Sequence, residues 1–153
     1  MFRMRSFMLG AGVAVLLVTA FSERAAAQRG SLSGTLSGRR NSPRSDTLAL
    51  RIALQMTPGW HIGAARPGVT GVPTELAWRL PAGWRVVATR WPPRASAMVG
   101  RDTVFEYRGP FAIEATVVTD GRRRSGAIQA LVTYGICKDV CIPGRLTLKY
   151  DVR

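Results

Sequence analysis

The two cysteines of the chain, Cys137 and Cys141, are the residues best suited to covalent chemistry. Their spacing allows the separation of about 4.4–6.8 Å between Cα atoms that a disulfide requires, across one helical turn or across a tight hairpin. Both flanking stretches, residues 127–134 and 145–152, alternate apolar and polar residues as half-buried strands do. The pattern therefore predicts that the cysteines lie where two strands meet at a turn, with residues 138–140 between them.

Three kinds of site compete for this cysteine pair. A structural zinc site needs four Cys or His ligands, and two cysteines with one histidine are too few, so we expect no metal. An inert structural disulfide is a second interpretation, although closing a five-residue loop contributes only about 2 kcal/mol on the chain-entropy model. A redox-active pair is the third, because a partner's thiolate can reach cysteines at an exposed turn. The spacing alone leaves the structural and the redox interpretations open.

Other residues give weaker signals for chemistry. His61 is the lone histidine, and no residue that could orient it as a base is visible in the sequence, so we expect a structural role for it. The chain contains no glycine-rich nucleotide-binding motif, and we expect no cofactor. The four tryptophans are expected in the core and not on a sugar-stacking surface.

The first 27 residues have the pattern of an export signal. Arg3 and Arg5 precede an apolar run from Phe7 to Phe21, and small residues follow at 25–27. The run is shorter than the ~20 residues of a spanning helix, so we expect cleavage before Gln28. The mature protein is then expected to be soluble and periplasmic or otherwise exported, in an oxidising compartment where disulfides persist.

The formal net charge of +13 comes mostly from arginine. These arginines are scattered through the strand patterns and are not clustered on one helix, which argues against nucleic-acid binding. We expect a monomer with a charged, solvated surface that favours acidic partner surfaces or anionic lipid head groups.

The remaining chain predicts an all-β fold. Residues 28–46 contain few apolar side chains and are expected to form a flexible segment before a single domain at 47–153. Strand patterns occupy 47–56, 74–80, 84–91, 103–107 and 111–119 in addition to the cysteine hairpin, whereas 94–101 is expected to be a loop. About eight short strands without a helical period indicate an immunoglobulin-like antiparallel β-sandwich.

Several motifs together resemble the N-terminal domain of DsbD-type thiol:disulfide interchange proteins, especially the ScsB variants related to copper tolerance. The motifs occur in the family's order over most of the chain after residue 57, and the cysteine motif is the most specific of them. They are Pro58-Gly59-Trp60-His61-Ile62, Pro67-Gly68 with Gly71-Val72-Pro73-Thr74-Glu75, Leu80-Pro81-Ala82-Gly83-Trp84, Trp91-Pro92, and Cys137-Lys138-Asp139-Val140-Cys141-Ile142-Pro143.

The resemblance implies that Cys137 and Cys141 cycle between dithiol and disulfide. By position, Cys141 corresponds to the cysteine that forms mixed disulfides with partners, and Cys137 to the resolving cysteine. The implied partners are a thioredoxin-like electron donor belonging to a membrane reductase system and oxidised periplasmic substrate proteins. Full-length members continue into a membrane transporter and a thioredoxin-like domain, so we expect a separate reductant to supply the electrons here.

Two positions depart from the family's pattern. Residues 63–65 are Gly-Ala-Ala where the family often has aromatic residues, and the region of the family's cap loop offers only Met98. Two other functions stay open from the sequence. One is a binding module with an inert disulfide, and the other is a copper-handling role in which Met98 assists the two thiolates, because soft sulfur ligands suit Cu(I).

Overall fold

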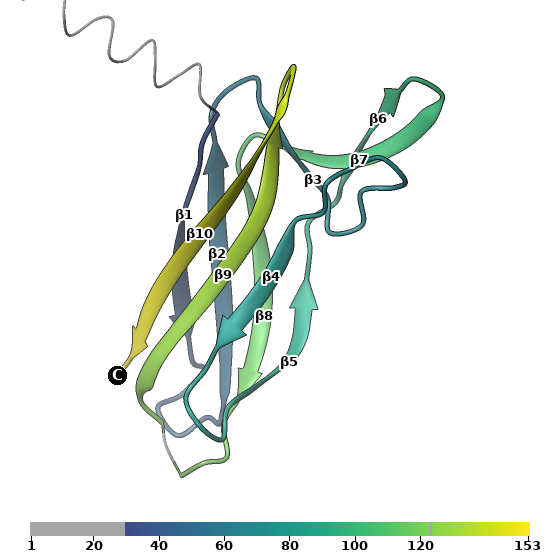
Figure 1. The fold of residues 1–153 in the computed structure, drawn as a ribbon. Helices are drawn as coiled ribbons and strands as arrows, with labels where there is room; N and C mark the ends of the chain where they lie inside the picture. Colours follow the sequence, from purple (N-terminus) through teal and green to yellow (C-terminus); the bar gives the residue numbers. More distant parts are fainter. Residues whose placement is uncertain (1–29, 123) are drawn as a thin grey trace, which may run out of the picture.

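The computed structural model describes residues 30–122 and 124–153, and within them it contains ten strands and no helix (Figure 1). The predicted export signal at residues 1–27 and the cleavage site before Gln28 lie outside the described residues. None of the described residues belongs to a helix long and apolar enough to cross a membrane.

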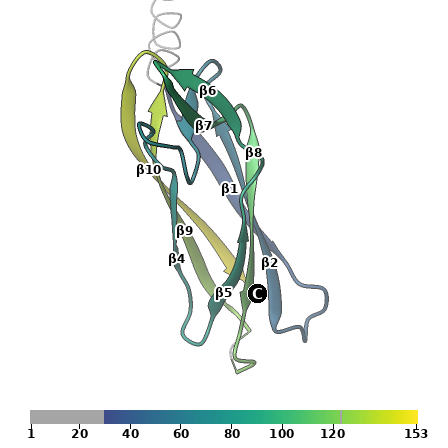
Figure 2. The same ribbon diagram turned by 90° about the vertical axis from the view of Figure 1, so that its right-hand side faces the viewer.

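The strands form two antiparallel sheets that face each other, as the immunoglobulin-like prediction requires (Figures 1 and 2). One sheet has the order β1-β2-β8-β5, and the other has the order β10-β9-β3-β7-β6, with β4 also paired to β9. The strands are β1 (Leu32–Arg39), β2 (Thr47–Met56), β3 (His61–Gly63), β4 (Glu75–Arg79), β5 (Arg85–Arg90), β6 (Ala95–Val99), β7 (Asp102–Arg108), β8 (Phe111–Val118), β9 (Gly126–Cys137) and β10 (Cys141–Val152).

The core lies between the sheets and follows the alternation of the sequence. In β2 every second residue, from Leu48 to Met56, is buried, which confirms the strand predicted there. Ile128, Ala130 and Val132 of β9 face these residues from the other sheet and are fully buried. A period of two places alternate side chains on opposite faces, so each strand presents one apolar face to the core.

The prediction of a flexible segment at 28–46 is wrong for residues 32–39, which form β1 and pair with β2 along their whole length. Leu32 and Leu36 enter the core. Gly34 lies against Leu54, and Gly38 lies against the ring of Tyr150, at distances that leave no room for a Cβ atom. The glycines that made the stretch look unstructured are thus needed for close packing of a strand.

The prediction of a loop at 94–101 is also wrong. Residues 95–99 form β6, which pairs with β7 through a turn at Gly100, where φ is +64°. Most of β6 is exposed, so it lacks the alternation of buried apolar residues by which a strand is recognised. The β6–β7 hairpin lies at the same end of the sandwich as the β9–β10 turn (Figures 1 and 2).

Candidate functional site: a disulfide at the β9–β10 turn

Cys137 and Cys141 form a disulfide across the turn between β9 and β10, with 4.0 Å between their Cα atoms. Cys137 is the last residue of β9, Cys141 is the first of β10, and the two are direct partners in the ladder. The Lys138 amide donates to the Val140 carbonyl and closes the turn. The predicted position of the cysteines at a hairpin turn is therefore confirmed.

The two cysteines differ in access to solvent. Cys137 is only 7% exposed, and its Sγ lies 3.7 Å from the carbonyl oxygen of Gly135. Cys141 is exposed, as are the turn residues 138–140. A thiolate attacks a disulfide along the line of the S–S bond, and Cys141 is the residue of the pair that lies open to solvent.

His61 is the direct neighbour of Cys137 across the sheet. It pairs with Cys137 of β9 on one side and with Arg108 of β7 on the other, so the three residues form one row across β9, β3 and β7. Directly paired residues project from the same face of a sheet. The next row, Ile136 and Ile62, projects from the opposite face into the core and is buried.

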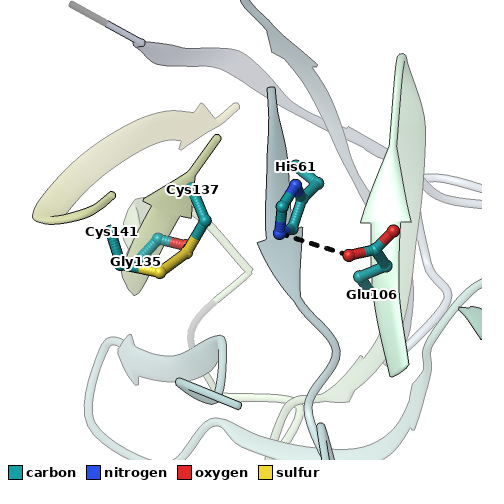
Figure 3. Close-up of a disulfide and its surroundings, with 5 residues drawn as sticks. All are labelled: His61, Glu106, Gly135, Cys137 and Cys141. Atoms are coloured by element: carbon teal, nitrogen blue, oxygen red, sulfur yellow. Dashed lines mark hydrogen bonds and ion pairs between the residues drawn. A yellow bond between two sulfur atoms is a disulfide. The ribbon is translucent and has the colours of Figure 1, made fainter. Parts of the chain in front are cut away.

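Glu106 provides the partner that the sequence did not reveal for His61. It is 3% exposed and lies on β7 opposite Gly63, two residues along β3 from His61 and therefore on the same face. One of its oxygens, Oε2, lies 3.2 Å from Nε2 of His61, and the other accepts from Nε of the exposed Arg108. Figure 3 shows the imidazole between the disulfide and this carboxylate.

The wall of the site is the loop at residues 64–74. Thr74 anchors it, because its hydroxyl donates to the Gly63 carbonyl over 2.6 Å and its amide donates to the Ala64 carbonyl over 3.3 Å. Val72 lies over Gly63 and Gly135, which are two residues along their strands from His61 and Cys137. A Cβ atom on Gly63 would overlap the Val72 carbonyl, so position 63 has no space for a side chain.

A pocket of about 230 Å³ opens beside the disulfide and is lined by His61, Glu106, both cysteines, the turn and the 64–74 loop. Its size is below the ~300–1,000 Å³ of typical small-molecule sites. Three exposed valines contribute to its lining, Val72 at 44%, Val99 at 54% and Val140 at 65%. They form an apolar rim on a strongly charged surface.

Met98, the residue expected in the cap region, does not line this pocket. It is exposed, and its sulfur accepts from the hydroxyl of Thr103. The adjacent Val99 lines the pocket instead, because neighbouring residues of β6 point to opposite faces. A larger and more open hollow of about 610 Å³ lies over β1, β2 and β8 and contains none of the site residues.

The described residues contain no group of three or more His, Cys, Asp or Glu side chains arranged to hold a metal ion. The polar groups of the site are instead a histidine, a buried carboxylate and a disulfide. Such a set can carry out thiol exchange and proton transfer.

The fold and the site define a class of protein. It is a β-sandwich domain with one disulfide at the tip of a hairpin, in which one cysteine is buried and the other is exposed. Residues 37–150 match the family model described as "Thiol:disulfide interchange protein DsbD, N-terminal", and the chain belongs to this family. The resemblance seen in the sequence motifs is thereby confirmed.

One solved structure supports the fold. The N-terminal periplasmic domain of ScsB from Proteus mirabilis aligns with a TM-score of 0.57 and 18% identity, over 80% of this chain and 46% of that chain. The chain thus spans about half the length of that protein. The GAE domain of GGA2p from Saccharomyces cerevisiae aligns with a TM-score of 0.49 and 10% identity, over 80% of this chain and 89% of that one.

The reduced N-terminal domain of DsbD from Neisseria meningitidis aligns with a TM-score of 0.40 and 11% identity, over 71% of this chain and 78% of that one. No curated protein sequence matches the chain. The ScsB alignment supports the shared fold, and the family match carries the assignment to thiol:disulfide interchange.

Proposed function

We propose that the domain passes electrons in the periplasm from a thioredoxin-like donor, part of a membrane reductase system, to oxidised exported proteins. Cys141 attacks the partner's disulfide, and Cys137 then resolves the mixed disulfide. The observation that carries this proposal is the unequal exposure of two bonded cysteines at a hairpin tip. The exposed sulfur can meet a partner, while the buried one is protected from it and can only attack its neighbour.

The β9–β10 hairpin also supports a disulfide that takes part in exchange over one that only stabilises the fold. The two strands are paired from Cys137 and Cys141 to Gly126 and Val152, so the ladder keeps the ends of the turn together without the sulfurs. A five-residue loop adds only about 2 kcal/mol to this. The bond can therefore open and close while the sandwich stays folded.

The apolar rim supports a protein as the partner. Exposed valines beside a reactive group give up hydration when another surface covers them, at about 25 cal/mol for each Å² of apolar area. Thioredoxin is a suitable probe because its potential, near −270 mV, lies close to the boundary between labile and structural disulfides.

The test is a trapping experiment. The probe is a thioredoxin variant with one active-site cysteine, activated as a mixed disulfide with thionitrobenzoate. We expect the Cys137→Ser variant to displace thionitrobenzoate and to accumulate a covalent complex with thioredoxin through Cys141. The reduced wild type should form the same complex and then release thioredoxin, and Cys141→Ser should form little complex.

A second measurement separates exchange from an inert disulfide. Reduced thioredoxin should open the oxidised domain's disulfide, and the equilibrium gives its potential. A disulfide that stays oxidised at potentials down to about −300 mV belongs to the structural kind and would contradict the proposal.

A further inference from the structure

We propose that His61, held by Glu106, is the proton acceptor that activates Cys137 as the resolving nucleophile. This inference rests on the proposed exchange function and assigns one of its steps. In that step Cys137 Sγ attacks Cys141 Sγ of the mixed disulfide, the S–S bond between the cysteines forms, and the bond between Cys141 and the partner breaks. The proton of Cys137 passes to His61, which returns it to the leaving thiolate of the partner.

The need for a base follows from the burial of Cys137. The thiolate is the nucleophile in disulfide exchange, and an apolar surrounding disfavours the charged form of a thiol. Cys137 is 7% exposed and has the carbonyl oxygen of Gly135 as its neighbour, which can accept a hydrogen bond from the thiol but cannot stabilise a thiolate. Cys141, in contact with water, does not have this difficulty.

The placement of His61 follows from the strand register. As direct partners on adjacent antiparallel strands, His61 and Cys137 project from one face, and their Cβ atoms are about 5 Å apart by the geometry of such pairs. Both side chains line the same pocket. The histidine is partly exposed, so water can exchange its proton once each cycle is complete.

Glu106 determines which nitrogen of His61 can act. A carboxylate at 3.2 Å from Nε2 favours the tautomer that carries its proton there, and Nδ1 is then the acceptor. The carboxylate can perform this task because it is buried and is itself held by Arg108. The arrangement of carboxylate, imidazole and thiol has the logic of an activated nucleophile with an oriented base.

The strand register and the β9–β10 turn also bring other charged groups near the imidazole. Arg108 faces it from β7 in the same row, and Lys138 and Asp139 lie on the turn beside the pocket. The lining residues of the 64–74 loop, Thr70 to Val72, carry no charge, and neither does Val99 of β6. Arg108 and Lys138 thus bring positive charge to the surroundings of the imidazole, and Glu106 and Asp139 bring negative charge.

A merely structural role for the pair is the competing interpretation. A buried carboxylate needs partners, and Arg108 and His61 satisfy Glu106 whether or not exchange takes place. The two interpretations differ in one measurable property. With a histidine base the resolution rate levels off within the range of about pH 5 to 8, in which histidine side chains change charge, whereas without a base it keeps rising with the thiolate fraction of Cys137.

The experiment uses the reduced domain and a high concentration of glutathione disulfide, with acid quenching and mass spectrometry to follow the mixed disulfide on Cys141. His61→Gln is the main variant, because its amide can still donate to Glu106 but cannot accept a proton at neutral pH. Glu106→Gln is the second variant. Glu114→Gln, which alters an exposed carboxylate paired with Arg51 on the other sheet, is the matched control.

We expect His61→Gln to slow the resolution step about 100-fold at pH 7, as loss of a general base does, and to replace the levelling of the rate toward pH 8 by a continuous rise with pH. Glu106→Gln should show a smaller loss with the levelling displaced along the pH axis, and Glu114→Gln should match the wild type. Attack of Cys141 on glutathione disulfide, measured in the Cys137→Ser background, should be unchanged by His61→Gln.

Two results would overturn the inference, and they are distinguishable. A wild-type domain that keeps glutathione on Cys141 without resolving it would overturn the proposed function and this step with it. Resolution that proceeds in the wild type and has the same rate and pH profile in His61→Gln would overturn the role of His61 alone. Circular dichroism establishes that each variant is folded, and if His61→Gln is not, the Glu106→Gln profile decides.

Discussion

The side chain of Val72 lies against Gly135 so closely that a Cβ atom at residue 135 would be 2.9 Å from Val72 Cγ1. Gly135 is two residues from Cys137 in β9 and projects from the same face of the sheet. The contact therefore fixes the loop that walls the pocket directly onto the strand that carries the buried cysteine.

Gly135→Ala should destabilise the domain by about 1–3 kcal/mol, because the added methyl group overpacks a closed contact. Val72→Ala in the same chain should relieve part of this loss, since it removes Val72 Cγ1 and Cγ2 but leaves Cβ at 3.0 Å from the new methyl group. When Val72→Ala is combined with Gly63→Ala, it should not restore stability, because the atom that blocks a side chain at residue 63 is the backbone carbonyl oxygen of Val72. Urea unfolding of the single and double variants measures the coupling, and equal relief at both glycines would contradict this geometry.

A Cys137→Ser, Cys141→Ser double variant should remain folded, with an unfolding free energy about 2 kcal/mol lower than that of the oxidised domain. Typical domains have about 5–15 kcal/mol, and the pairs of the β9–β10 ladder beyond Cys137 and Cys141 do not involve the sulfurs. Urea titrations of the variant, the oxidised and the reduced wild type provide the comparison. An unfolded double variant would show that the disulfide is an essential staple.

Val99→Asp should slow exchange with the thioredoxin probe while leaving exchange with glutathione nearly unchanged. A protein that covers the apolar rim must remove water from the new carboxylate, which costs free energy. A small disulfide reaches Cys141 without covering the rim. Val87→Asp is the matched control, because Val87 is 49% exposed on β5 of the other sheet. Equal effects of the two substitutions on thioredoxin would remove the rim from the docking surface.

The stability of the domain should fall at high pH through Tyr107. Burial raises the pKa of this phenol above the ordinary value of 10.0, and the Ala65 backbone and the charge of Arg94 only partly offset it. The unfolded chain therefore ionises first, and the contribution is complete below about pH 10 and is lost as the pH rises through the pKa of the folded state.

Tyr107→Phe lacks this contribution, so its unfolding free energy should decline less steeply than that of the wild type between pH 9 and 11. Urea unfolding at each pH gives the two curves. Tyr150→Phe, which removes a partly exposed phenol that donates to the Gly38 carbonyl, is the control. Parallel curves for wild type and Tyr107→Phe would contradict the prediction.

The local alternation of apolar and polar residues was enough to predict the strands that have one buried face and one exposed face. Residues 47–56 alternate because one face meets the core and the other meets water, and the hairpin around Cys137 and Cys141 follows from two such stretches joined by a short turn. β1 and β6 escaped prediction because their side chains do not show this contrast. β1 is closely packed through glycines, and β6 is exposed on most of its length.

The sequence by itself determined that the chain is a β-sandwich with a cysteine pair at a hairpin turn, and its motifs indicated the family. Only the tertiary structure decided that His61, Cys137 and Glu106 share one face around a pocket. Their chain positions are 31 to 76 residues apart, and the pairing of β3 with both β7 and β9 sets their neighbours. A register shift of one residue would turn His61 into the core, and local periodicity carries no information about which strands pair.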